Sequence, residues 1–155
     1  MNNNTEADSM SDDTAKALAN ACAKHMFACD PATQGLGIEI AAVQPGYAEA
    51  RMTVREDMLN GHGSCHGGFI FTLADSAFAF ACNTYNNITV ASGASMEFLA
   101  PAYLGDRLLA CAKEQVRGRR RGVYDVEVGT EDGRKIGLFR GHSHARNEPL
   151  LPDRD

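Results

Sequence analysis

Residues 66–81 read HGGFIFTLADSAFAFA and hold one charged side chain between Gly67 and Ala81, the carboxylate of Asp75. A helix that is apolar on nearly every side is typical of a protein interior rather than of a surface. Aspartate is almost never buried without a partner or a chemical role. The stretch therefore predicts a buried central helix that carries a reactive carboxylate and opens on two glycines.

Strand-like patterns lie on both sides of this helix. The segments that precede it are separated by a Gln-Pro-Gly turn, and those that follow it end at prolines, glycines or charged turns. One helix that is apolar all round, together with consecutive antiparallel strands, predicts an α+β fold in which the sheet wraps the helix, which is the hotdog arrangement. The six expected strands are residues 36–42, 47–54, 88–99, 107–116, 123–128 and 135–144.

The two ends of the chain are polar. Residues 1–13 are low in hydrophobicity and are expected to form a disordered tail, whereas helical spacing of apolar residues begins at Thr14. The segment 147–155 holds two prolines and is expected to be a loose tail. A chain of 155 residues suffices for one full hydrophobic core, so we predict one domain at residues 14–146.

Charge and composition argue against several classes of function. The formal net charge is -5, whereas nucleic-acid binding usually needs a basic face, so no nucleic-acid partner is expected. No apolar run is long enough to cross a bilayer, so no membrane partner is expected. The N-terminus lacks the basic and apolar segments of an export signal, and five dispersed cysteines fit reduced thiols. We therefore expect a cytoplasmic protein.

Several stretches resemble the signature of the hotdog acyl-CoA thioesterases, and most closely the phenylacetate-pathway subfamily known as PaaI. They are LNGHGSCHGG at 59–68, FTLADSAFA at 71–79, SMEFLAP at 95–101 and GVYD at 122–125. The resemblance covers roughly residues 14–146. It implies an enzyme that hydrolyses an acyl-CoA, typically phenylacetyl- or hydroxyphenylacetyl-CoA, and that uses no cofactor besides the coenzyme A of its substrate.

The resemblance also implies roles for individual residues. Asp75 matches the aspartate that activates the attacking water, and Gly67 matches the glycine whose backbone N–H binds the thioester carbonyl. Asn60 matches the asparagine that helps to place the water or the substrate. His66 is expected to border the thioester or to hold the loop by a hydrogen bond. The residues leave open whether the carboxylate activates water or attacks the carbonyl directly and forms an anhydride.

The glycine pair supports the same chemistry independently of the resemblance. The first turn of a helix has free N–H groups and the positive end of the helix dipole. Such a donor, when it is aimed at a carbonyl, stabilises a developing oxyanion by about 3–4 kcal/mol. Glycine also lets a substrate approach the backbone closely. The alternative is that Gly67 and Gly68 only shape a tight turn before the helix.

The spacing of the two groups predicts a shared site. Asp75 lies eight residues beyond Gly67, which is about 12 Å along a helix at 1.5 Å per residue. One carbonyl cannot meet both groups from a single chain. A two-fold dimer with antiparallel helices would bring Asp75 of one chain opposite Gly67 of the other. We therefore expect a homodimer at minimum, and a homotetramer as the assembled state.

Four arginines crowd the turn at residues 117–121 of a chain that is otherwise acidic. Coenzyme A carries a 3′-phosphate and a pyrophosphate, and arginine suits both groups. Arg119 and Arg120 are therefore candidates for binding these phosphates, together with Arg140 from the last expected strand. The alternative for the turn is that its charges are simply solvated.

Two further patterns were weighed. His62 and His66 have the spacing of a metal-binding pair, but the glycines around them oppose a helix and no third ligand is evident, so no metal site is predicted. The phenylalanines of the helix are expected to be divided between the core and an acyl pocket suited to aromatic groups. These are Phe69, Phe71, Phe78 and Phe80.

Two other functions remain compatible with a hotdog fold. The first is an acyl-CoA hydratase or dehydratase, which usually needs an Asp–His or similar acid–base pair, whereas no histidine lies beside the aspartate on the helix. The second is a non-catalytic acyl-CoA binding protein. The presence of both Gly67 and Asp75 argues against it.

Overall fold

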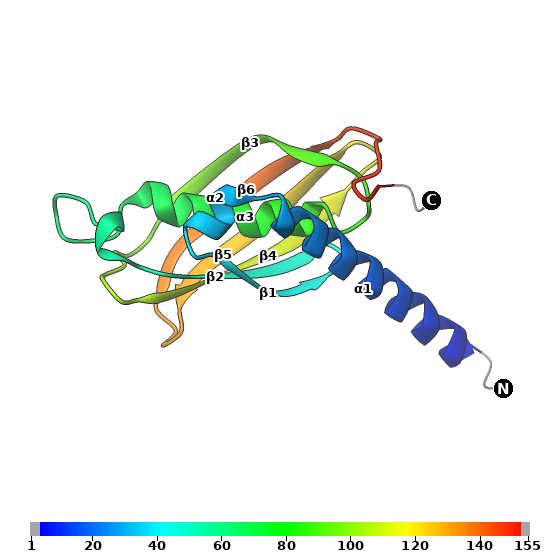
Figure 1. Cartoon of the computed structure of the whole chain (residues 1–155), viewed down its shortest axis with the longest axis horizontal. Coiled ribbons are helices and arrows are strands. Elements are labelled where there is room, and N and C mark those ends of the chain that lie inside the picture. The colour runs from blue at the N-terminus through cyan, green and yellow to red at the C-terminus, as the bar shows by residue number, and fades with distance from the viewer. Residues whose placement is uncertain (1–3, 153–155) are drawn as a thin grey trace.

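A six-stranded antiparallel sheet wraps one long helix in the computed structural model, which describes residues 4–152 (Figure 1). The strand order is β1-β2-β4-β5-β6-β3, so β1 and β3 form the two edges of the sheet. The predicted α+β hotdog arrangement is confirmed. In chain order the elements are α1 (Asn4–Ala28), α2 (Pro31–Gly35), β1 (Glu39–Gln44), β2 (Tyr47–Thr53), η1 (Glu56–Met58), α3 (Gly67–Cys82), β3 (Thr89–Phe98), β4 (Arg107–Arg117), β5 (Arg121–Thr130) and β6 (Lys135–Ala145).

The predicted central helix is α3, and its apolar side chains fill the hollow of the sheet. Leu73, Phe78 and Phe80 of α3 are each at most 1% exposed. The Phe78 ring meets Tyr124 of β5 and Phe139 of β6 at centroid distances of 5.5 and 5.8 Å. The strands alternate inward apolar and outward polar residues, as a half-buried sheet requires. Within the described part of the chain, no helix is long and apolar enough to cross a membrane.

The N-terminal helix is longer than the sequence predicts. We expected disorder over residues 1–13, but α1 begins at Asn4. The stretch from Asn4 to Ala28 holds neither proline nor glycine, so no residue interrupts the helix although its first part is polar. Residues 1–3 of the expected tail lie outside the described residues. The first half of α1 projects beyond the sheet (Figure 1).

The expected loose tail at 147–155 is held against the domain over much of its length. The side-chain oxygen Oδ1 of Asn86 accepts hydrogen bonds from the backbone N–H groups of Leu150 and Leu151, at 3.1 and 2.8 Å. Asn86 has a φ of 53°, a conformation that asparagine tolerates better than most residues. The polar composition of the tail gave no sign of this remote acceptor. Residues 153–155 lie outside the described residues.

The edge strand β3 stands apart from the others in its exposure. Of its ten residues only Thr89 and Met96 are partly covered, and the rest are exposed. One side of β3 pairs with β6, while its other side forms an edge of the sheet. Its middle is made of small residues, Ala91 to Ser95. An uncovered edge of this kind is a ready site for pairing with another strand.

The contact between Phe78 and Gly141 provides a test of how α3 is fixed to the sheet. A Cβ atom at Gly141 would lie 2.8 Å from two carbons of the Phe78 ring. We therefore expect Gly141→Ala to lower the free energy of unfolding by about 1–3 kcal/mol through overpacking. Urea denaturation measures the change. Gly35→Ala is the matched control, because a Cβ there would meet nothing within 4 Å, and unchanged stability of Gly141→Ala would contradict the contact.

Candidate active site

The first turn of α3 presents a backbone N–H for which the described residues offer no acceptor. His66 is the N-cap of the helix, and its Nδ1 accepts a hydrogen bond from the Gly68 N–H at 2.9 Å. The His66 carbonyl accepts from the Phe69 N–H at 3.0 Å. Within residues 4–152, no hydrogen bond is made by the Gly67 N–H. The cap therefore satisfies the neighbouring donors and leaves the Gly67 N–H available.

A close aromatic neighbour explains why residue 67 is a glycine. A Cβ atom on Gly67 would lie 3.0 Å from Cζ of Phe98, the last residue of β3. That distance is tighter than ordinary side-chain contact, so any larger residue would have to displace the ring. Phe98 is nevertheless 54% exposed. Sequence reasoning did not single out this residue, because its distance of 31 positions from Gly67 in the chain hides the contact.

Asn60 organises the loop that leads into α3. Its Oδ1 accepts hydrogen bonds from the N–H groups of His62 and Ser64 at 2.8 and 3.3 Å, and its Nδ2 donates to Ser64 Oγ at 3.1 Å. His62 is exposed in this loop. Asn60 and Gly67 thus lie at the two ends of one loop-to-helix segment. No group of three or more His, Cys, Asp or Glu side chains suited to a metal ion occurs among the described residues.

Asp75 lies halfway along α3 and is partly buried. It shares the least covered face of the helix with Gly68, Thr72 and Ala79, which follow one another at spacings of three or four residues. Burial raises the pKa of the Asp75 carboxyl above its ordinary value. Within the described part of the chain, its carboxylate makes no hydrogen bond or ion pair. A carboxylate in this environment is a stronger base than one in water.

Gly67 and Asp75 do not meet within one chain. They lie eight residues apart on one helix, which corresponds to about 12 Å along its axis. The structure thus brings Asn60, His66, Gly67 and Phe98 together at one end of α3 and leaves Asp75 farther along the same helix. A complete site that uses both groups needs a second chain.

The three candidate arginines fall into two places. Arg119 and Arg120 are exposed in the turn between β4 and β5, and they line a small pocket of about 100 Å³ with Tyr85, close to the C-terminal end of α3. Arg140 lies on the outer face of the sheet, on the side opposite α3, and its Nε and Nη2 donate to the carboxylate of Asp125 at 2.6 and 2.8 Å. Arg140 is therefore already paired and does not join the other two.

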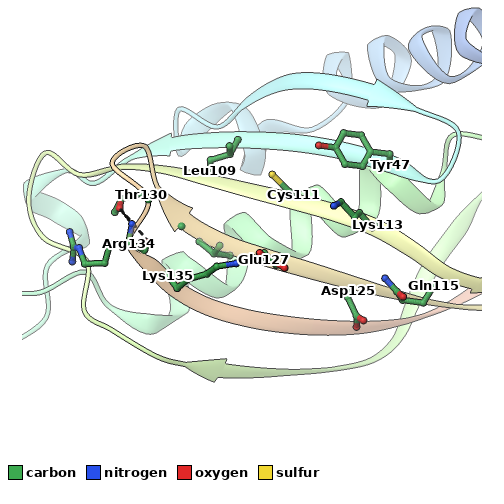
Figure 2. Close-up of a pocket in the computed structure, with 13 residues that line it drawn as sticks. Tyr47, Leu109, Cys111, Lys113, Gln115, Asp125, Glu127, Thr130, Arg134 and Lys135 are labelled. Carbon is green, nitrogen blue, oxygen red and sulfur yellow. Dashed lines mark hydrogen bonds and ion pairs between the residues drawn. The ribbon is translucent and has the colours of Figure 1, made fainter.

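A larger groove of about 390 Å³ also lies on the outer face of the sheet (Figure 2). Most of the residues that line it have polar or charged side chains, and their charges partly neutralise one another, as in the ion pair between Lys135 and Glu127. None of the residues predicted for the site lines this groove. The chemistry expected from the sequence belongs to the other face, where α3 lies.

The helix phenylalanines prove to be mainly core residues. Phe78 and Phe80 are each 1% exposed. Phe71 is partly buried and meets Phe139 edge-on at 5.2 Å. Phe69 is also partly buried and lies edge-on to His66. Of the expected division between core and acyl pocket, Phe78 and Phe80 take the core part, because the sheet encloses them, and Phe69 and Phe71 are left as the candidates for the pocket.

Comparisons with known proteins place the chain in a family. Residues 62–136 match the model of the thioesterase superfamily. The acyl-coenzyme A thioesterase PaaI of Escherichia coli is 46% identical over 129 residues, which cover 83% of this chain and 91% of that protein. A putative esterase of Archaeoglobus fulgidus is 35% identical over 128 residues, covering 83% of each.

Solved structures agree with this placement. The structure of E. coli PaaI matches with a TM-score of 0.85 and 42% identity, over 86% of this chain and 97% of that one. A mutant of the phenylacetic acid degradation protein PaaI of Thermus thermophilus matches with a TM-score of 0.71 and 41% identity, over 74% and 98%. The chain therefore belongs to the thioesterase superfamily and is a thioesterase with the hotdog fold. Within it the chain resembles the PaaI acyl-CoA thioesterases, so the predicted family is confirmed.

The burial of Asp75 leads to a prediction about stability. Its pKa is raised in the folded state, so the folded chain binds the proton more tightly than the unfolded chain. Stability therefore falls as the pH rises from the unfolded pKa through the folded pKa, and the full cost is present above it. Asp75→Asn removes this cost, and we expect a higher Tm than wild type at neutral pH.

Thermal unfolding across a pH series measures this difference in Tm. The gain should shrink as the pH falls toward the range in which an ordinary aspartate is protonated, about pH 4. A lower Tm for Asp75→Asn at neutral pH would mean instead that the carboxylate makes a stabilising contact.

Proposed function

We propose that this protein is a cytoplasmic homodimeric thioesterase that hydrolyses arylacetyl-CoA, such as phenylacetyl-CoA or its ring-hydroxylated forms, to the free acid and coenzyme A. The observation that carries the proposal is that one helix holds both the Gly67 N–H, which has no acceptor among the described residues, and the half-buried carboxylate of Asp75. The likeness to PaaI proteins of two bacteria supports the substrate class.

The proposed reaction uses each group for one task. The thioester carbonyl oxygen accepts a hydrogen bond from the Gly67 N–H, which stabilises the negative charge that develops there. Asp75 takes a proton from a water molecule whose oxygen attacks the carbonyl carbon. The carbon–sulfur bond then breaks, and the departing thiolate takes up the proton that Asp75 accepted, so that one acid and one thiol form and Asp75 is ionised again. We favour this base route over an anhydride because burial raises the pKa of Asp75 and so strengthens it as a base.

The neighbouring residues support these tasks. His66 uses Nδ1 as an acceptor for the Gly68 N–H, which requires that this nitrogen carry no proton and places the proton of a neutral ring on Nε2. His66 thereby sets the first turn and borders the carbonyl site. Asn60 fixes the preceding loop through its side chain, and in the dimer it helps to place water or substrate. No metal or redox cofactor takes part in this scheme.

A dimer built on the β3 edge completes the site. The exposed, small-residue strand β3 suits antiparallel pairing with a second copy. Two-fold symmetry then sets the two α3 helices antiparallel, so that Asp75 of one protomer faces the partner's Gly67. Two such dimers form the proposed tetramer. Because each protomer supplies one half of two sites, a separated monomer would have none.

The same dimer geometry places the basic turn at residues 117–121 where it can bind the phosphates of coenzyme A. Arg119 and Arg120 lie near the C-terminal end of α3, which in an antiparallel pair lies toward the partner's first α3 turn. The guanidinium of Arg117 stacks on the Tyr85 ring at 3.8 Å and steadies the turn. We therefore assign Arg119 and Arg120 to the coenzyme A phosphates. Arg140, which is paired with Asp125 on the outer face, is the weaker candidate.

A thiol-release assay on a panel of acyl-CoA substrates tests the activity and its selectivity. Phenylacetyl-CoA is expected to exceed acetyl-CoA in kcat/KM by at least about tenfold, which needs only about 1.4 kcal/mol of additional transition-state binding. Asp75→Asn should lower turnover by about 100-fold or more because it removes the general base. Faster hydrolysis of hexanoyl-CoA than of every arylacetyl-CoA would overturn the selectivity. Loss of the enoyl absorbance of an added α,β-unsaturated acyl-CoA, without thiol release, would indicate the lyase alternative.

Complementation between two inactive variants tests the shared site. Gly67→Pro removes the donor N–H, and proline fits the first position of a helix. His66 has φ −62° and ψ 132°, which suits a residue that precedes proline. When Gly67→Pro chains are mixed with Asp75→Asn chains, activity should reappear, because one of the two sites in each heterodimer is then intact.

Gly67→Ala is the matched control, since it brings the same Cβ toward Phe98 but keeps the N–H. If heterodimers verified by mass spectrometry show no more activity than either parent, the cross-subunit arrangement is wrong.

A further inference from the structure

Phe98 differs from the phenylalanines of the core in its surroundings. Phe78, Phe80 and Phe139 are at most 2% exposed, whereas Phe98 is 54% exposed. It ends β3 and pairs with Gly137 of β6. An aromatic ring normally stabilises a protein by being buried. One side of Phe98 meets the backbone of α3 at Gly67, and much of the rest of its surface remains uncovered.

The contact with Gly67 places the ring next to the proposed carbonyl site. The ring atoms Cζ, Cε1 and Cε2 lie 3.0, 3.2 and 3.6 Å from the position of a Cβ on Gly67. A carbonyl oxygen that accepts the Gly67 N–H lies about 2.9 Å from its nitrogen. The carbonyl end of an acyl group bound there therefore lies close to Phe98. In an arylacetyl group a single methylene separates the carbonyl from the aromatic ring, so an aryl group directed toward Phe98 comes within stacking range.

The segment beyond Phe98 is held in place by specific contacts. Arg134 donates from Nη1 to the Pro101 carbonyl at 2.5 Å and from Nη2 to Asp106 Oδ2 at 2.7 Å. Its guanidinium also lies 5.6 Å from the centroid of the Tyr103 ring. The exposure of the apolar side chains here therefore belongs to an ordered surface. Tyr103 is 50% exposed like Phe98, but it already has Arg134 as a neighbour.

We propose that Phe98 is a specificity-determining residue whose exposed ring packs against the aryl group of the substrate. The assignment rests on the proposed thioesterase function and gives it a structural basis for preferring aromatic acyl groups. The enclosed rings of Phe78 and Phe80 cannot supply that preference, because the sheet separates them from any ligand. Offset or edge-to-face packing between the two rings would favour an aryl over an alkyl group of similar size.

The test compares two substrates in three variants. Phe98→Leu keeps an apolar side chain but removes the ring, Phe98→Tyr keeps the ring, and Tyr103→Leu removes a similarly exposed ring next to the same end of the sheet. The ratio of kcat/KM for phenylacetyl-CoA over hexanoyl-CoA is measured for each. We expect Phe98→Leu to lower the ratio by about threefold to tenfold, while Phe98→Tyr and Tyr103→Leu leave it near the wild-type value.

Equal losses for both substrates in Phe98→Leu, or dissociation of the dimer in size-exclusion chromatography, would overturn the assignment, since Phe98 would then support Gly67 or the interface. Calorimetric binding of both acyl-CoAs to Asp75→Asn, with and without Phe98→Leu, separates this question from catalysis. A selective loss of phenylacetyl-CoA affinity supports the assignment even if the wild-type chain proves to be a binding protein without turnover. If Phe98→Leu leaves the affinity of Asp75→Asn for each of the two acyl-CoAs unchanged, the assignment is wrong.

Discussion

The burial of α3 in the hollow of the sheet is the constraint on which the rest of the structure depends. The helix has apolar residues on nearly every side, so it is stable only where strands cover several of its faces. Phe78 packs against Tyr124 and Phe139 and sits over Gly141, where any side chain would displace it. These contacts fix the position of the helix relative to β5 and β6. These packing contacts therefore determine the position of every functional group on α3.

Two groups on α3, the Gly67 N–H and the Asp75 carboxylate, have unusual properties because of their surroundings. His66 caps the helix and occupies the Gly68 amide, whereas the Gly67 N–H, at the positive end of the helix dipole, has no acceptor in the part of the chain that the structure describes. Asp75 is partly removed from water, which raises its pKa and makes its ionised form costly, and no residue between 4 and 152 pairs with its carboxylate. A natural protein keeps such a cost where it serves function, and here it leaves a basic carboxylate on the least covered face of the helix.

The outer face of the sheet and its β3 edge differ in how far their polar groups are paired. On the outer face, side chains such as Lys135 and Glu127, or Arg140 and Asp125, pair across strands and suit contact with water. At the β3 edge, by contrast, backbone groups are left without a strand partner and Phe98 stays exposed beside Gly67. Gly67 and the unpaired edge strand therefore lie at one side of the molecule, as the proposed shared site requires.

Local patterns in the sequence were enough to predict the central helix and the sheet that wraps it, and they indicated Gly67 and Asp75 as candidates for the chemistry. Each of these depends on residue types and spacings within a short window, and the family resemblance added the role of Asn60. Other features depend on contacts between distant positions. Asn86 holds Leu150 and Leu151, and Phe98 comes to lie against Gly67 only when β3 pairs with β6. Periodicity records which face of an element is apolar but not which residue of another element lies opposite, so only the tertiary structure decided these neighbours.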